Sequence, residues 1–224
     1  MPTQRRSRYT RNCQTTSPIH LIMLDQNRPA TPDTRERILT TGEQLILGKG
    51  FSALGLSELL STAAVPKGSF YHYFASKEAF GVALLERYFR NYQQKTSELF
   101  SGTELSARQK LVLYFEQWLA LAQVPDCTRL CLGVKLAAEV SDLSDAMRQA
   151  LAEGMASHCA QLAAVINQAK QEGSVTESID ATELAGFLYS CWIGASVFAK
   201  VQKNPAAMHT TYRQSMLSLF GSSA

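Results

Sequence analysis

The stretch GLSELLSTAAVPKGSFYHYF, residues 55–74, decides how the N-terminal part of this chain folds. It predicts one helix over residues 56–63 and a second over residues 66–74, because apolar side chains recur at helical spacing on both sides of a small-residue turn. Pro66 suits the first turn of the second helix, where its missing N–H costs no hydrogen bond. Two short helices joined by a tight turn form a helix-turn-helix unit. The residues expected to bury one helix against the other are Leu59, Leu60, Ala63, Phe70 and Phe74.

The second of these helices carries side chains that suit contact with DNA. Lys67 can neutralise a phosphate, and Gly68 lets the backbone approach a duplex closely because it has no side chain. We expect Tyr71 and His72 to contact DNA and not to be buried, since an apolar core gains little from their polar ends. Lys77, near the start of the next helix, can reach the DNA backbone. We therefore expect the DNA-facing residues of this segment to be Lys67, Gly68, Ser69, Tyr71, His72, Tyr73 and Lys77.

The composition indicates a helical globular protein. Hydrophobic residues make up 46% of the 224 residues, which suffices for a packed core, and only 7 prolines occur among abundant alanine and leucine. A net charge of +3 permits nucleic-acid binding without arguing for it. No apolar run approaches the roughly 20 residues that a membrane span needs, and residues 19–24 are too short for the core of a secretion signal. The five cysteines then indicate free thiols in a reducing cytoplasm.

The chain is expected to divide into an N-terminal extension and two helical domains. Residues 1–32, rich in arginine and polar residues, indicate a disordered extension. The alternatives are a basic arm that enters a DNA groove and a translation start at Met23. Residues 33–80 form the predicted DNA-binding domain, and residues 81–224 form the predicted regulatory and dimerisation domain.

The fold class is all-α, because no segment shows the sustained alternation of a strand. Asp33 or Thr34 suits the N-cap of the first helix, and Gly50 suits its end. The predicted helices cover residues 33–48, 56–63, 66–74, a long segment from 76 onward, 105–123, 128–139, 143–172, 181–202 and 205–220.

The N-terminal segment resembles the DNA-binding domain of the TetR family of transcriptional repressors. The resemblance implies that helix 66–74 enters the major groove, and it adds Ser57 to the residues that touch DNA. Ala64 departs from the family, which usually has glycine at this position. If the turn needs a positive φ, alanine there costs roughly 1 kcal/mol. The matching residues are Phe51, Leu59, Ala63-Ala64-Val65, Lys67-Gly68-Ser69-Phe70-Tyr71, Tyr73-Phe74 and Ser76-Lys77-Glu78.

The remaining chain is similar in layout to the family's regulatory domain, which implies a homodimer with an effector site. In the family, the last two long helices of each subunit pack into a four-helix bundle. Two recognition helices about 34–36 Å apart would then read a near-palindromic operator in double-stranded DNA. Apolar stripes that suit both core and partner contact comprise Leu184, Phe187, Leu188, Cys191, Ala195, Phe198, Met208, Tyr212, Met216 and Leu219.

A short segment from Cys127 to Lys135 indicates a sensor in the regulatory domain. On a helix, Cys131 and Lys135 share a face, and Arg129 is near in sequence. Positive neighbours lower the pKa of a thiol and enrich the reactive thiolate. The alternative is a buried, inert cysteine. Cys127 can act as a resolving thiol, although helix geometry resists an intrahelical disulfide.

The run CLGVKLAAEVSDLSDAMRQAL, residues 131–151, together with residues 66–87, resembles a family member that responds to electrophiles and reactive chlorine through thiol chemistry. This resemblance implies that Cys131 is the sensor and that the amine of Lys200 closes a reversible bond with the oxidised sulfur. Such a bond is a sulfenamide. The implied effector is a small electrophile or oxidant, and the implied response is release of the operator of detoxification genes.

Other interpretations of the sequence remain open. A reversibly bound apolar ligand can act on the same repressor from a pocket lined by Trp118, Phe187, Trp192 and Phe198. A helical adaptor without DNA binding is a second alternative. An enzyme is not expected, because no phosphate-binding loop, dinucleotide fingerprint or metalloprotease motif occurs.

Thiolate and imidazole groups that could bind a metal are offered by Cys127, Cys131, His158 and Cys159. Their spacing matches no recognised zinc site, and adjacent residues on a helix point to different faces. We therefore expect neither a metal nor a cofactor.

Overall fold

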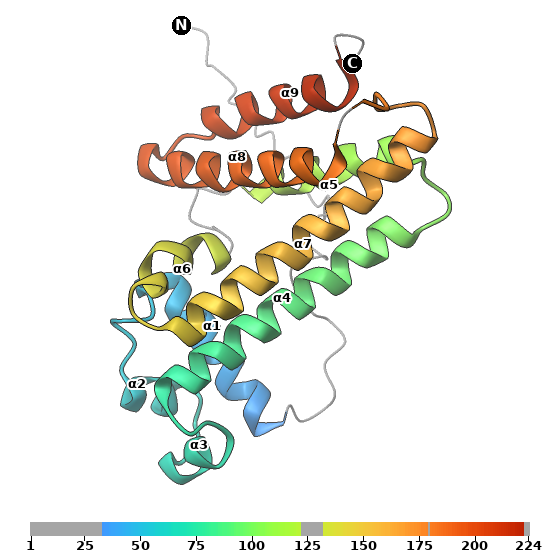
Figure 1. The fold of residues 1–224 in the computed structure, drawn as a ribbon. Helices are drawn as coiled ribbons and strands as arrows, with labels where there is room; N and C mark the ends of the chain where they lie inside the picture. Colours follow the sequence, from blue (N-terminus) through green and yellow to red (C-terminus); the bar gives the residue numbers. More distant parts are fainter. Residues whose placement is uncertain (1–32, 122–131, 179, 222–224) are drawn as a thin grey trace, which may run out of the picture.

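The described part of the chain is all-helical, which confirms the predicted fold class (Figure 1). The computed structural model describes residues 33–121, 132–178 and 180–221. The predicted extension 1–32 lies outside the described residues, as do Cys127, Arg129 and Cys131. The helices of the described residues are α1 (Thr34–Lys49), α2 (Leu56–Thr62), α3 (Lys67–Tyr73), α4 (Lys77–Ser101), α5 (Ala107–Leu121), α6 (Leu132–Ser141), α7 (Asp145–Gln171), α8 (Ala181–Gln202) and α9 (Ala206–Phe220).

The ends of α1 follow from local sequence. Asp33 is the N-cap, and its side chain accepts a hydrogen bond from the backbone N–H of Arg35. Gly50 ends the helix at φ 90°, a conformation that glycine adopts without strain. Its N–H donates to the carbonyl of Ile46 at 2.8 Å. Both predicted boundaries of this helix are therefore confirmed.

The turn between α2 and α3 needs a positive φ at its centre. Ala64 has φ 51°, so alanine occupies the left-handed conformation at the position where the family usually has glycine. The next N–H, of Val65, donates to the carbonyl of Leu60 at 3.0 Å and closes the turn. Pro66 was predicted to lie in the first turn of this helix. In the structure it is the N-cap, in extended conformation, and α3 begins one residue later at Lys67.

A first hydrophobic core holds α1, α2 and α3 together. It contains the predicted Leu59, Leu60, Ala63, Phe70 and Phe74, and the first half of α4 from Phe80 to Phe89. Side chains from far along the chain complete it, because Leu132, Leu136 and Val140 of α6 and Met147 and Leu151 of α7 are buried in the same cluster. Residues 33–80 therefore do not close their own core.

The long helices α4 and α7 lie side by side and connect the N-terminal helices to the layer of α5, α8 and α9 (Figure 1). Their close approach depends on Gly154 of α7, where an added Cβ would lie 2.2 Å from the Phe89 ring of α4. Van der Waals contact between carbons needs roughly 3.5 Å or more. Only glycine therefore fits this crossing as it stands.

A second core joins α5, α7, α8 and α9. Its centre is Trp192, which is fully buried, stacks on Phe115 at 5.2 Å and donates from its indole N–H to Ser215 at 2.9 Å. By length and composition, α8 is apolar enough to cross a membrane, the one such helix among the described residues. A core helix of a folded domain passes the same test, and Trp192 and Ala195 place α8 in this core.

Candidate DNA-binding surface and sensor region

Helix α3 has an exposed polar face on one side and a buried aromatic residue, Phe70, on the other. Phe70 is fully buried and packs against Phe74 and Phe80, with ring centroids 5.3 and 5.9 Å away. Tyr71 is 50% exposed, which agrees with the prediction that its ring is not part of the core. A Cβ at Gly68 would meet nothing within 4 Å, so the surface there is open. Lys67, Gly68, Tyr71 and His72 are exposed together on α3, and Ser57 is exposed on α2.

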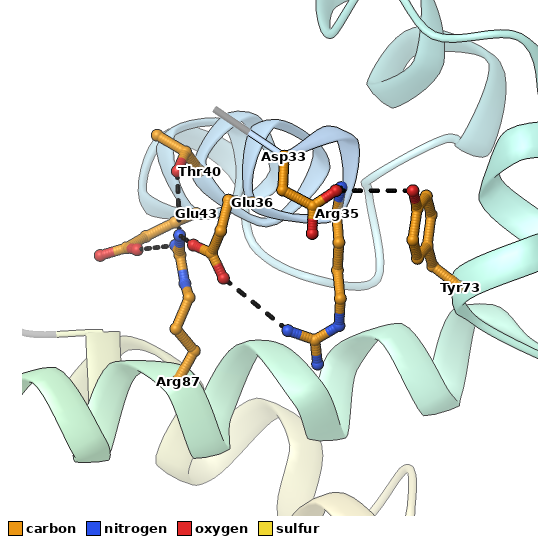
Figure 2. Close-up of polar contacts among 7 residues, drawn as sticks. All are labelled: Asp33, Arg35, Glu36, Thr40, Glu43, Tyr73 and Arg87. Carbon is orange, nitrogen blue, oxygen red and sulfur yellow. Dashed lines mark hydrogen bonds and ion pairs between the residues drawn. The ribbon is translucent and has the colours of Figure 1, made fainter. Parts of the chain in front are cut away.

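Two predicted DNA contacts on this segment are half-buried instead of exposed. Ser69 lies in the middle of α3. Tyr73 ends that helix, and its hydroxyl donates to Asp33 at 3.5 Å, which links α3 to the N-cap of α1 (Figure 2). DNA contact by either residue stays a prediction.

Lys77 makes contacts within the protein that the sequence did not indicate. Its ammonium donates to the carbonyl of Ser52 at 3.3 Å and lies 4.8 Å from the centroid of the Phe51 ring. Burial lowers the pKa of Lys77, partly offset by the nearby carboxylate of Glu139. The ammonium of Lys77 is thus bound to the connection between α1 and α2. Contact between Lys77 and DNA stays a prediction.

Sequence reasoning missed Arg87, a buried arginine on α4 that joins α4 to α1 (Figure 2). Its guanidinium donates to Glu36 at 2.9 Å, Thr40 at 2.9 Å and Glu43 at 2.5 Å. These three partners lie on one face of α1 because they are spaced by four and three residues. Two sequence features could have indicated this contact. One is the polar triplet Glu36, Thr40 and Glu43 at helical spacing, and the other is a single arginine within the apolar stripe of α4. The arrangement joins α1 to α4 through one buried guanidinium.

In the predicted sensor region, the structure brings Lys200 of α8 next to Lys135 of α6. Burial lowers the pKa of Lys200, and the charge of Lys135 and a side-chain hydrogen bond with it lower that pKa further. A lowered pKa increases the fraction of the neutral, nucleophilic amine. Lys135 lies in the first turn of α6, which begins at Leu132. The predicted partner Cys131 lies outside the described residues, so its pairing with Lys200 stays a prediction.

The four residues of the predicted ligand pocket do not come together. Trp118 and Trp192 are buried with ring centroids 5.4 Å apart, and the Trp118 indole N–H donates to Ser196 at 3.2 Å. Phe187 and Phe198 are exposed on α8, at 57% and 60%. The two tryptophans therefore pack in the core, whereas the two phenylalanines face away from it.

Sequence reasoning also missed the setting of His158, which lies fully buried on α7. Burial lowers its pKa from 6.5 to about 4, so the ring is neutral near pH 7. Its Nε2 lies 2.6 Å from the hydroxyl of Tyr114, and its Nδ1 has no hydrogen-bond partner in the structure. Burial raises the pKa of the neighbouring Cys159, which makes that thiol less reactive. The described residues contain no group of three or more His, Cys, Asp or Glu side chains that could hold a metal ion.

Comparison with known proteins gives a consistent result over both halves of the chain. Residues 38–91 match the family described as bacterial regulatory proteins of the tetR family, and residues 107–215 match the tetracyclin repressor-like C-terminal domain. Over 178 residues the chain is 44% identical to the HTH-type transcriptional repressor NemR of Escherichia coli K12, covering 80% of this chain and 89% of that protein. It is 30% identical over 175 residues to the HTH-type transcriptional repressor DhaR of a Mycobacterium species, covering 78% and 86%.

A solved structure supports the same relationship. The crystal structure of reduced E. coli NemR matches with a TM-score of 0.78 at 42% identity, covering 86% of this chain and 100% of that chain. A helix-turn-helix with an exposed polar recognition face, joined to a helical C-terminal domain, defines a DNA-binding regulator and not an enzyme. The chain belongs to the TetR family of transcriptional regulators.

Proposed function

We propose that this chain is a dimeric, cytoplasmic repressor that releases its operator when Cys131 is modified by an electrophile or by reactive chlorine. The observation that carries the proposal is the position of Lys200, whose amine has a lowered pKa beside Lys135 on α6. The residue that precedes this helix in sequence is Cys131. Sulfur–nitrogen bond formation needs a neutral amine, and the lowered pKa of Lys200 increases the neutral fraction of its amine. By analogy with relatives, the controlled genes act in detoxification.

The proposed oxidation balances with hypochlorous acid as the oxidant. The thiolate of Cys131 attacks chlorine, which gives a sulfenyl chloride and hydroxide. The neutral amine of Lys200 then displaces chloride from sulfur and loses a proton, which leaves a sulfenamide with a net loss of two hydrogen atoms. A thiol reductant reverses this step. An electrophile such as N-ethylmaleimide instead adds to the sulfur directly and needs no lysine.

An exposed apolar stripe on α8 supports the dimer. Phe187, Gly194 and Val201 recur every seven residues, with Cys191 and Phe198 between them. Phe198 is 60% exposed and Val201 is 78% exposed. A run of such side chains at heptad spacing is typical of a helix that packs against a partner helix. A charged substitution, Phe198→Glu, should therefore yield monomers in sedimentation experiments and abolish tight operator binding.

The test of the thiol mechanism uses fluorescence anisotropy with a DNA fragment from upstream of the protein's own gene. Wild-type protein should bind this fragment, and treatment with N-ethylmaleimide or hypochlorite should weaken the binding. The Cys131→Ser variant should bind equally well and keep its affinity after treatment. The matched control Cys159→Ser should respond like wild type, because burial raises the pKa of that thiol. Undiminished release from Cys131→Ser would contradict the thiol mechanism.

The role of Lys200 is tested separately by mass spectrometry of the hypochlorite-treated protein. Wild type should yield a peptide linked between Cys131 and Lys200, with the loss of two hydrogen atoms. Lys200→Met should not yield it, yet should still respond to N-ethylmaleimide. A linked wild-type product that joins Cys131 to another amine would refute the assignment of Lys200.

A further inference from the structure

We propose that Glu139 is the positioning residue that fixes the helix-turn-helix to the regulatory half of the protein. Glu139 lies near the end of α6, and its carboxylate reaches the connection between α1 and α2. Its Oε2 accepts from the backbone N–H of Phe51 at 3.0 Å, and its Oε1 accepts from that of Ser52 at 2.7 Å. A carboxylate that accepts two charge-assisted bonds from consecutive N–H groups holds that backbone segment in one place.

The connection between α1 and α2 has space for the Glu139 carboxylate because Gly50 has no side chain. A Cβ at Gly50 would lie 2.8 Å from Oε2 and 3.0 Å from Oε1 of Glu139, so the absence of a side chain leaves the approach open. Burial raises the pKa of Glu139, but hydrogen bonds from Ser52 and Phe51 outweigh burial, and the pKa lies below its usual value. The carboxylate is therefore ionised near pH 7, which strengthens both bonds.

The same backbone segment is bound by a second helix. Lys77, the first residue of α4, donates to the carbonyl of Ser52 at 3.3 Å. The N–H of Ser52 is thus held by α6, and its carbonyl is held by α4. Since Ser52 lies shortly before α2 begins at Leu56, these contacts set where α2 and then α3 are placed.

Helix α6 is suited to move this contact because it touches both halves of the protein. Leu132, Leu136 and Val140 are buried in the core of α1, α2 and α3. Lys135, one turn before Glu139, lies beside Lys200 of α8. The inference rests on the proposed function in that a change at the sensor displaces α6. Displacement would break the bonds that Phe51 and Ser52 donate to Glu139 and free the connection before α2.

The first experiment measures operator affinity, again with DNA from upstream of the protein's own gene. Glu139→Gln removes a negative charge, so electrostatics alone predicts tighter binding to DNA. The proposed clamp predicts the opposite, a loss of about tenfold, because charge-assisted bonds that position the reading helices are lost. Glu139→Asp keeps the charge but shortens the reach, and should also lose affinity. Glu86→Gln, an exposed acid on α4, is the matched control for charge. Tighter or unchanged binding by Glu139→Gln would overturn the proposal.

The second experiment follows hydrogen exchange of individual amides and does not need DNA. The N–H groups of Phe51 and Ser52 should exchange at least about tenfold faster in Glu139→Gln than in wild type. The N–H of Gly50, which donates to Ile46, should keep its protection. Unchanged exchange at Phe51 and Ser52 would refute the clamp. A general loss of protection across α1 to α3 would instead show a purely structural role, and would also refute it.

The third comparison separates this inference from the thiol mechanism. Treatment with N-ethylmaleimide should weaken operator binding by wild type more than binding by Glu139→Gln, since the variant has already lost the contact through which the signal acts. An equal fold-change in both proteins would refute the transmission of the signal through Glu139. If treatment leaves wild type unaffected, the thiol mechanism fails, and the first two experiments still decide whether Glu139 acts as the clamp.

Discussion

Replacing Arg87 with methionine tests the contact that joins α4 to α1 (Figure 2). The change removes three hydrogen bonds, to Glu36, Thr40 and Glu43, while methionine keeps most of the buried aliphatic volume. The side chains of Glu36 and Glu43 are 47% and 30% exposed, so water can solvate both carboxylates after the guanidinium is gone.

That exposure decides the size of the effect. Leaving a fully buried charge without its partner costs about 3–5 kcal/mol, but the hydrated carboxylates here reduce this penalty. Each screened ion pair contributes about 1 kcal/mol, and the bond to Thr40 adds about 1 kcal/mol. The buried Nε of Arg87 has no partner in the structure, so its removal returns part of that total. We therefore expect the free energy of unfolding to fall by about 2 kcal/mol.

The assay is urea unfolding followed by circular dichroism, at one fixed protein concentration because the protein is proposed to be a dimer. Arg90→Met is the matched control, since Arg90 is exposed on the same helix and should change stability by no more than about 0.5 kcal/mol. Arg87→Lys should be intermediate, because one ammonium cannot reach all three acceptors. If Arg87→Met were as stable as Arg90→Met, the contact would not hold α1 on α4.

Three further predictions concern stability. Ala64→Gly should stabilise the protein by about 0.5–1 kcal/mol in thermal unfolding because Ala64 has φ 51°, and a lower melting temperature would contradict this. Gly154→Ala should destabilise it by about 2–3 kcal/mol in urea, since the new Cβ would lie 2.2 Å from Phe89; unchanged stability would show that the helices separate freely. Burial lowers the pKa of His158 to about 4, so the unfolded chain binds the proton more readily. Protonation of His158 should therefore not affect the free energy of unfolding above pH 6.5, and should lower it by about 2–3 kcal/mol as the pH drops towards 4. The variant His158→Gln should lose this pH dependence, and the control His72→Gln should keep it.

Much of the DNA-binding unit could be predicted because its signals are local. The cap at Asp33, the helix end at Gly50 and the anchors Phe70 and Phe74 each depend on spacing within a few residues. The positive φ at Ala64 was anticipated as a condition of the turn, and the structure shows it. Such features follow from backbone geometry that a short segment determines by itself.

Other features could not be predicted because their partners are distant in sequence. Lys77 was expected to face DNA, but Ser52, which lies 25 residues earlier, accepts its hydrogen bond. Glu139 binds backbone 87 and 88 residues earlier, and nothing in its own helix indicates that partner. Trp118 and Trp192 were predicted to line a ligand pocket, and only the packing of distant helices shows that they lie in the core.

The sequence by itself determined the helical class, the helix-turn-helix and the family, since periodicity, caps and turn residues act over one or two turns of chain. The tertiary structure decided how those helices are held. It completed the N-terminal core with side chains from residues 132–151 and joined α1 to α4 through Arg87. It also brought Lys135 near both Lys200 and Glu139. These outcomes depend on which distant side chains meet when both cores close, and burial then determines the pKa values of Lys200, Glu139 and His158.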